Sequence, residues 1–446
     1  MPLQKNQVLT LRVERLSSDG SGVAHSPDGE TVFIPGAAPG DEARVRIVKD
    51  CKRYAFGILD EVLTPSPDRI PVDCAVAGPC GGCSLRHLDY AAELRAKQEN
   101  VADAFARIGG LDVPVLPIVG SPEVNRYRNK VQFPVGVDKS GKPCIGFYAG
   151  RTHRIVPCPD CRLQPGVLNE IGNALCAFFA EKGIQPYSEE TGRGLVRHIF
   201  LRRGAHSGQI MVCLVCTRAK LPSAEELCTR LKAQFAEITT ILLNVNAKNT
   251  NVILGTETHT LYGPGYIEDT LCGVPVQLGP LSFYQVNTLA AEQLYGIAAQ
   301  YAQLTPDDLL LDLYCGMGTI GLSMAAHCRE LIGVEIVPEA IESAKANAAR
   351  MGADVAAKSR FFCADAGQAA TRLAAEGLHP DIVMLDPPRK GCDEATLSAV
   401  VRMSPRRVVY VSCNPATAAR DAAWLEQNGY HAEKVQPVDL FPRTRH

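Results

Sequence analysis

The sequence lacks any run of apolar residues long enough to cross a membrane, and its first residues lack the charged and then apolar pattern of an export leader. We therefore expect neither a membrane protein nor an exported one, and place the chain in the cytoplasm. A surplus of charge is also missing, because 46 lysines and arginines face 48 aspartates and glutamates, for a net charge of −2. Composition thus gives no sign of a nucleic-acid partner, and any basic surface must be local.

A chain of 446 residues is expected to form about three domains.

Cysteine is abundant in this chain. In a chain of this length without a leader, 17 cysteines indicate metal ligation or thiol chemistry more than a disulfide framework, and an odd number cannot pair completely.

Residues 6–63 consist of short alternating runs separated by the turn clusters SSDGSG, SPDGE and AAPGD. About five short strands at this spacing predict a small β-barrel, followed by the linker TPSPDRIP. Basic residues lie on or beside these strands, where they form either a solvated polar face or a contact with RNA. They are Arg12, Arg15, Arg44, Arg46, Lys49, Lys52 and Arg53.

The stretch from Pro71 to about Gly273 mixes helices with antiparallel strands. Hairpins are predicted around DKSGKP and AHSG, and an amphipathic helix over residues 90–108, ending at a pair of glycines. Arg126, Arg128 and Lys130 alternate on one face of an expected strand. Such a row can follow phosphates, although exposed basic faces are common without that role.

From about Val276 onwards, strands alternate with helices, which predicts a mostly parallel sheet with helices on both faces. Ligands of such sheets bind beyond the carboxyl ends of the strands. Cys413, in VVYVSCNPAT, lies at such an end. A free cysteine is more often a small core residue than a functional group, so this position alone does not establish a role.

A metal site is predicted by CAVAGPCGGC, which spaces Cys74, Cys80 and Cys83 as C-x5-C-x2-C. Zinc and iron–sulfur clusters both accept four thiolates, and spacing does not distinguish them. The fourth ligand must come from elsewhere in the chain, and VPCPDCRLQP offers Cys158 and Cys161.

A cofactor pocket is predicted by LLLDLYCGMGTIGL, which places three glycines between an apolar strand and a helix. Glu335 ends the next strand, where a carboxylate suits the hydroxyls of a ribose, so that NAD and S-adenosylmethionine both fit. Asp365 ends the third strand, and Asp386 opens an Asp-Pro-Pro-Arg loop after the fourth. An Asp-Pro-Pro loop beside a thiol at the next strand end favours a methyl donor with a nucleophile nearby.

Together these features resemble the bacterial RNA uracil-C5 methyltransferases, in particular the iron–sulfur branch that acts on 23S ribosomal RNA. The likeness covers nearly the whole chain and rests on the cysteine array and on SFYQVN, LDLYCGMGTIGL, LDPPRKG and VSCNPAT. It implies a multidomain α/β protein. The expected domains are a TRAM-like RNA-binding β-barrel over residues 1–64, a central α+β iron–sulfur domain over 65–275, and a Rossmann-like methyltransferase domain over 276–446.

The resemblance also assigns roles to individual residues. Cys413 would be the nucleophile that adds to C6 of uridine, giving 5-methyluridine through a covalent intermediate. Contacts with S-adenosylmethionine fall to Gln285, Tyr314, Thr319, Glu335, Asp365 and Asp386. A [4Fe–4S] cluster would be held by Cys74, Cys80, Cys83 and Cys161, with Cys158 as the alternative fourth ligand.

The family's terminal motif F-P-x-T-x-H-x-E is matched only as far as His446, before the glutamate expected to accept the C5 proton. A chain of this length is therefore expected to release its product slowly. Two other functions fit the sequence, an NAD-dependent iron–sulfur oxidoreductase and a catalytically silent RNA-binding protein. No obligate protein partner is evident.

Overall fold

The computed structural model describes residues 3–150, 152–248 and 250–446. The chain divides into two compact units, one made of residues 1–124, 148–156 and 433–446 and the other of 125–147 and 157–432. The three domains expected from the sequence remain a prediction. Across the described residues, no helix combines the length and apolar character needed to span a bilayer.

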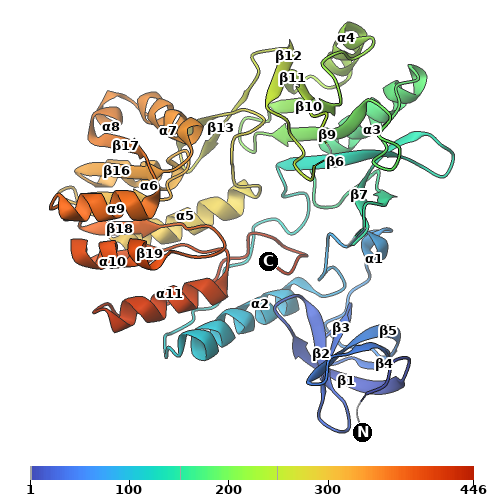
Figure 1. Cartoon of the computed structure of the whole chain (residues 1–446), viewed down its shortest axis with the longest axis horizontal. Coiled ribbons are helices and arrows are strands. Elements are labelled where there is room, and N and C mark those ends of the chain that lie inside the picture. Colours follow the sequence, from blue (N-terminus) through green and yellow to red (C-terminus); the bar gives the residue numbers. More distant parts are fainter. Residues whose placement is uncertain (1–2, 151, 249) are drawn as a thin grey trace. The chain divides into compact units, whose positions relative to one another are not determined.

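The first unit opens with a closed five-stranded barrel, drawn in blue in Figure 1, as the turn clusters predicted. Its strands follow the order β1-β2-β3-β5-β4. They are β1 (Val8–Leu16), β2 (Ser21–His25), β3 (Thr31–Pro35), β4 (Glu42–Asp50) and β5 (Tyr54–Thr64). Alternate side chains such as Val32, Val45 and Ile47 are buried inside the barrel, while their neighbours along each strand face outwards.

Two helices follow the barrel, α1 (Ala77–Cys80) and α2 (Tyr90–Ala104). The Asp89 carboxylate caps α2 by accepting from the backbone N–H of Ala92 at 2.7 Å. The helix continues as a π-helical turn, η1 (Phe105–Gly109), and Gly110 ends it in the left-handed conformation, with φ of 63°. The predicted helix over 90–108 is therefore confirmed.

Residues 433–446 pack against α2 inside this first unit. Lys97 donates to the Glu93 and Asp439 carboxylates, each at 2.8 Å. The backbone N–H of Arg443 donates to Glu93 at 2.7 Å. Both carboxylates are completely buried, and burial raises the pKa of Glu93 although Lys97 opposes that rise. The terminal segment thus contributes to the N-terminal unit, whereas the sequence assigned it to the methyltransferase domain.

The second unit contains a mixed sheet in which β12, β11, β10, β9, β6 and β7 are successive neighbours. These strands are β6 (Lys130–Val137), β7 (Pro143–Tyr148), β9 (Val196–Arg203), β10 (Ile210–Cys216), β11 (Ile238–Val245) and β12 (Glu257–Tyr262). Both predicted hairpins, β6 with β7 and β9 with β10, are present. Helices α3 (Gly166–Glu181) and α4 (Ala224–Gln234) bury their apolar faces against the sheet. The short strand β8 (Ile155–Pro157) contains the point at which the chain passes from one unit to the other.

The expected strand with three alternating basic residues is shorter than predicted. Strand β6 begins only at Lys130, and Arg126 has a left-handed backbone, with φ of 60°. Its guanidinium pairs with Asp160 at 2.7 Å and donates to the Cys161 carbonyl oxygen at 2.8 Å. Arg126 therefore fixes the loop that contains Cys161, and the expected alternation of three basic residues along one strand is wrong at Arg126.

A parallel sheet of order β17-β16-β15-β18-β19 forms the rest of the second unit. Its strands are β15 (Leu309–Leu313), β16 (Glu330–Glu335), β17 (Ser359–Cys363), β18 (Ile382–Leu385) and β19 (Arg407–Tyr410). The connecting helices are α6 (Thr319–Met324), η2 (Ala325–His327), α7 (Pro338–Arg350), α8 (Ala353–Lys358), α9 (Ala366–Ala375) and α10 (Glu394–Met403). Helix α5 (Thr288–Ala302) precedes the sheet, and α11 (Pro415–Gln427) follows it.

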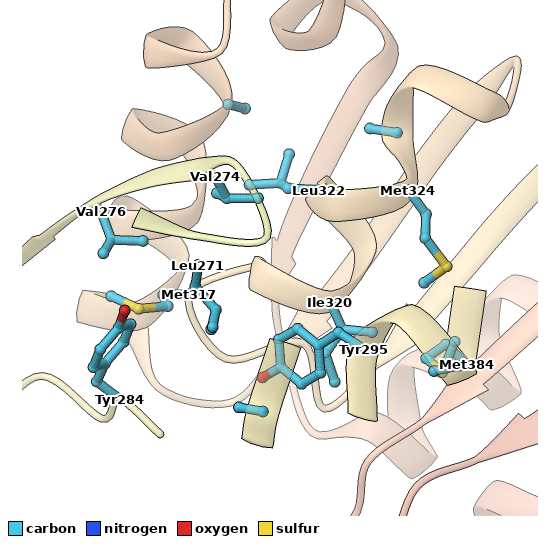
Figure 2. Close-up of a cluster of buried hydrophobic side chains, with 14 of the residues drawn as sticks. Leu271, Val274, Val276, Tyr284, Tyr295, Met317, Ile320, Leu322, Met324 and Met384 are labelled. Atoms are coloured by element: carbon cyan, nitrogen blue, oxygen red, sulfur yellow. The ribbon is translucent and has the colours of Figure 1, made fainter. Parts of the chain in front are cut away.

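Alternate residues of β15 enter opposite cores, which explains why its sequence LLLDL is apolar almost throughout. Leu310 packs with residues of α5, α6 and the hairpin β13 (Ile267–Leu271) and β14 (Val274–Leu278). Figure 2 shows part of this core, with Tyr295 beside Ile320. Leu311 packs on the other face with α9 and α10. Because both faces of the sheet are covered, the candidate site lies at the carboxyl edge of the sheet.

Candidate active site

The loop after β15 forms the centre of this edge. Tyr314, Gly316 and Gly318 all have positive φ, at 65°, 55° and 80°. At Gly318, a Cβ would lie 3.1 Å from Leu322 and 3.2 Å from Ala344, so the position favours glycine for space as well as for backbone conformation. The loop turns sharply at the start of α6, and the backbone N–H of Gly318 donates to the Cys315 carbonyl oxygen at 2.8 Å. This is the geometry that the glycine motif predicted.

Glu335 lies beside this loop at the end of β16. Its carboxylate accepts from the backbone N–H of Gly316 at 3.2 Å and from that of Val337 at 2.9 Å. The carboxylate has about four lone-pair sites and these two bonds use one on each oxygen, so it can still accept from further donors such as the two hydroxyls of a ribose. Asp365, after the neighbouring strand β17, caps α9 by accepting from Gln368 at 3.1 Å. Both acids therefore stand where the sequence placed them, at adjacent strand ends.

Two further carboxyl groups lie close to the same loop, Asp312 and Asp386. Asp312 is buried within β15 and accepts from the backbone N–H of Gly321 at 3.0 Å through one oxygen, while its other oxygen has no partner among the described residues. Burial, with a smaller contribution from Asp386, raises the pKa of Asp312 to about 8. Burial also raises the pKa of Asp386 to about 7. Both groups are thus poised to carry a proton near neutral pH.

Sequence reasoning did not single out Asp312, although a lone acid inside the apolar run LLLDL was an available signal. A Cβ on Gly321 would lie 2.8 Å from the Asp312 carboxylate. The glycine therefore permits the close approach of α6 to this buried acid.

Tyr295 of α5 is a second residue that sequence reasoning missed. Its buried hydroxyl lies 3.5 Å from the Thr319 hydroxyl and also hydrogen-bonds the Gln285 side chain. The Gln285 carbonyl oxygen in turn accepts from Asn129 at 2.8 Å. Tyr295 therefore brings together two residues, Gln285 and Thr319, that the sequence predicted separately. No pattern in the sequence indicated this, because tyrosines in amphipathic helices usually serve the core.

Cys413 follows β19 at the same edge and is exposed. All 17 cysteines lie in the described part of the chain, and Cys363 is the other exposed one. Asn414 caps α11 by accepting from Ala416 at 3.1 Å, and its amide donates to the Arg389 carbonyl oxygen at 3.0 Å. The turn that presents the thiol is therefore tied to the Asp-Pro-Pro-Arg loop.

A buried acid, Asp421 of α11, braces that loop from behind. One of its oxygens accepts from the backbone N–H of Cys392 at 2.8 Å and from the Tyr410 hydroxyl at 2.5 Å. The neighbouring Arg420 donates to the Lys390 carbonyl oxygen at 3.0 Å. Because both loops are fastened to α11, the positions of Asp386 and Cys413 are linked.

The predicted metal ligands are divided between the two compact units. Within the described ranges, no three histidine, cysteine, aspartate or glutamate side chains are arranged to hold a metal ion. Cys74, Cys80 and Cys83 belong to the first unit, and Cys161 to the second. The pKa of Cys161 is lowered to about 6, and a hydrogen bond with Cys158 is the largest cause. A lowered pKa suits a metal ligand, because the thiolate is the form that binds metal. The arrangement as a whole does not support the cluster.

Comparisons with known proteins agree with these features. The model of the tRNA (uracil-5-)-methyltransferase family matches residues 207–446, and that of the TRAM domain matches residues 2–59. An uncharacterised RNA methyltransferase of Halalkalibacterium halodurans is 43% identical over 446 residues, covering 100% of this chain and 96% of that protein. One of Clostridium tetani is 40% identical over the same share of each chain.

Among solved structures, the chain is similar to the tRNA (uracil-54, C5)-methyltransferase of Pyrococcus abyssi in complex with S-adenosyl-L-homocysteine. The TM-score is 0.78 at 26% identity, covering 98% of both chains.

Proposed function

The chain belongs to the tRNA (uracil-5-)-methyltransferase family and carries an N-terminal TRAM domain, and from this premise we propose that it methylates uridine C5 in 23S ribosomal RNA. The observation that carries the proposed chemistry is the exposed Cys413 at the carboxyl edge of the parallel sheet, tied to the Asp386 loop. The choice of ribosomal RNA rests on the cysteine array, because this array resembles that of the iron–sulfur branch, which acts on 23S ribosomal RNA. Nothing in the comparisons favours the NAD-dependent oxidoreductase.

The methyl donor would be S-adenosylmethionine, which supplies an electrophilic methyl group when bound. Residues at the sheet edge fit such a ligand. Glu335 keeps lone pairs for the ribose hydroxyls, and the glycine loop offers backbone close to the ligand without obstruction. Asp365 would accept from the adenine amino group. We assign the remaining cofactor contacts to Gln285, Tyr314, Thr319 and Asp386.

Uracil C5 is too weak a nucleophile to take a methyl group unaided. The Cys413 thiolate would add to C6, forming a carbon–sulfur bond and moving the ring's electron pair towards C5 and O4. C5 would then form its bond to the methyl carbon as the methyl–sulfur bond of the donor breaks, and that electron pair would remain on the donor's sulfur. Removal of the C5 proton by a base restores the C5–C6 double bond and expels the thiolate. Asp386 and Asp312, whose pKa values are raised to about 7 and about 8, could hold a proton nearby.

The covalent step predicts that Cys413→Ala abolishes methyl transfer and the protein–RNA adduct. RNA carrying fluorine at C5 cannot lose a proton there, so it should trap the wild-type enzyme as a shifted band on a denaturing gel. Cys363→Ala is the matched control, since Cys363 is also exposed at a strand end of this sheet. Cys363→Ala should form the adduct normally. An adduct in Cys413→Ala would assign the nucleophile to another residue.

The RNA substrate is tested by mass spectrometry of ribosomal and transfer RNA from cells with and without the gene. Loss of 5-methyluridine from 23S ribosomal RNA supports the proposal. Loss from transfer RNA alone would instead match the substrate named for the Pyrococcus abyssi enzyme.

We keep the [4Fe–4S] cluster on Cys74, Cys80, Cys83 and Cys161 as part of the proposal, on the strength of the cysteine spacing and of the lowered pKa at Cys161. Anaerobically purified protein should be brown, with about four iron atoms per chain. Cys161→Ala should lose the iron, whereas Cys144→Ala, a half-buried cysteine outside the array, should keep it. Colourless protein with one zinc per chain would remove the cluster but leave the four ligands in place.

A further inference from the structure

Three aromatic side chains meet on the outer surface of the N-terminal barrel. Phe33 of β3 pairs in register with Phe56 of β5, and Tyr54 precedes Phe56 on the same face of that strand. The ring centroids lie 5.7 Å apart for Phe33 and Tyr54, 5.8 Å for Phe33 and Phe56, and 5.6 Å for Tyr54 and Phe56. Neighbouring positions Val32 and Ala55 point into the core. The rings, which we call the aromatic triad, are therefore not needed to fill the barrel.

The triad remains partly open to solvent. Tyr54 is 41% exposed, and the rings of Phe33 and Phe56 are half-buried against it. Strands β3 and β5, which carry the rings, lie side by side in Figure 1. An exposed group of aromatic faces on a soluble barrel is a candidate binding surface.

Three cations lie beside the triad. Lys49 of β4 pairs in register with Phe56, and Lys52 and Arg53 directly precede Tyr54. The Asp50 carboxylate accepts from the backbone N–H of Lys52 at 2.7 Å, but none of the three side-chain cations forms an ion pair within the described part of the chain. Elsewhere on the barrel, Arg44 pairs with Glu61 at 2.8 Å and Arg46 with Asp60 at 2.7 Å. The cations beside the rings therefore stay available to an anionic ligand.

We propose that the aromatic triad is a stacking platform for unpaired bases of the RNA substrate, with Lys49, Lys52 and Arg53 contacting the adjoining phosphates. The proposal rests on RNA methylation as the activity, and it names the barrel residues that would contact unpaired bases and phosphates away from the target uridine. Every base offers a π-face, and a single strand exposes both bases and phosphates. A protein partner would need acidic side chains placed beside apolar ones, whereas each nucleotide of a single strand carries both a base and a phosphate.

The test uses the full chain and a short uridine-rich single-stranded RNA oligonucleotide, compared with a duplex of the same sequence. Tyr54→Ala and Tyr54→Leu should each weaken single-strand binding by roughly ten-fold, because loss of one stacked base has about that effect. Duplex binding should be nearly unchanged, and Tyr54→Trp should retain single-strand affinity. Tyr262→Ala is the matched control, since Tyr262 is 39% exposed and has Lys232 4.9 Å from its ring centroid.

Replacing Lys49, Lys52 and Arg53 by glutamine tests the phosphate contacts. The salt dependence of single-strand binding should fall by about 0.7 in log–log slope for each phosphate that the variant no longer neutralises. Methyl transfer at saturating RNA is measured on the same preparations, and Tyr54→Leu should keep its kcat while KM rises. Wild-type affinity in Tyr54→Leu, or an equal loss for duplex RNA, would overturn the platform. Absence of methyl transfer by the wild type, whatever the binding results, would instead count against the proposed activity.

Discussion

At the scale of single residues, the carboxyl groups at the sheet edge differ in their burial and in the hydrogen-bond donors that face them. Glu335 is half-exposed and receives two backbone N–H groups, whereas Asp312 and Asp386 are surrounded by protein and have raised pKa values. Burial favours the neutral form of a carboxyl group, as it does at the two aspartates. Glu335 therefore suits a fixed acceptor of hydroxyl hydrogen bonds, and the two aspartates suit groups that hold protons.

Glu335→Ala should weaken binding of S-adenosylmethionine while leaving RNA binding nearly intact. Hydrogen bonds to a charged carboxylate contribute about 1.5–3 kcal/mol, so the dissociation constant should rise by roughly 10- to 100-fold. Calorimetry with the cofactor alone measures it. Glu339→Ala is the control, since this acid lies in the first turn of α7 and is not one of the predicted cofactor contacts. Unchanged affinity in Glu335→Ala would mean that the ribose lies elsewhere.

At the scale of elements, buried charges join α2 to the terminal segment. Lys97→Met would remove the cation that lies 2.8 Å from both buried carboxylates and would leave Glu93 only the more distant Arg443, at 3.8 Å. Removing one partner of a buried ion pair typically costs about 3–5 kcal/mol. Denaturant unfolding, followed with a probe in the first unit, should show a lower midpoint. Arg107→Met is the control, because its i,i+4 pair with Asp103 is exposed and contributes about 0.5 kcal/mol or less.

The loss in Lys97→Met should depend on pH. Since the folded-state pKa of Glu93 is raised, the folded protein binds more protons than the unfolded chain, so the stability contribution of this group rises as the pH falls. Lys97 lowers the pKa of Glu93, so its removal raises that pKa further and the variant gains more stability than the wild type from protonation. The destabilisation should therefore be smaller in acid than in alkali. A loss independent of pH would show that the stem of Lys97, and not its charge, is what matters.

At the scale of the whole molecule, the chain passes between its two compact units several times, after residues 124, 147, 156 and 432. Within the second unit, one core contains Met211 and Leu242 of the mixed sheet together with Tyr284 and Leu310 of the parallel-sheet region. The central and C-terminal regions expected as separate domains therefore share apolar side chains.

A fragment of residues 276–446 should accordingly fail to fold alone. It would expose the face of α5 and α6 that packs on Phe200, Met211 and the β13–β14 hairpin, and it would lack Asn129, which donates to Gln285. Expressed by itself, the fragment should give poorly dispersed amide signals in NMR spectra. The full chain under the same conditions is the reference. A well-dispersed fragment spectrum would support the domain boundary drawn from the sequence.

The sequence alone was sufficient for features that depend on neighbours along the chain. Turn clusters and alternating apolar residues determined the barrel and both hairpins, and the glycine motif and strand ends determined where Glu335, Asp386 and Cys413 stand, because backbone preferences and periodicity act locally. Other features required the tertiary structure. The role of Arg126, the link through Tyr295 and the meeting of Phe33 with Tyr54 all depend on groups from different elements. Contacts of that kind are decided by packing, which no local pattern encodes.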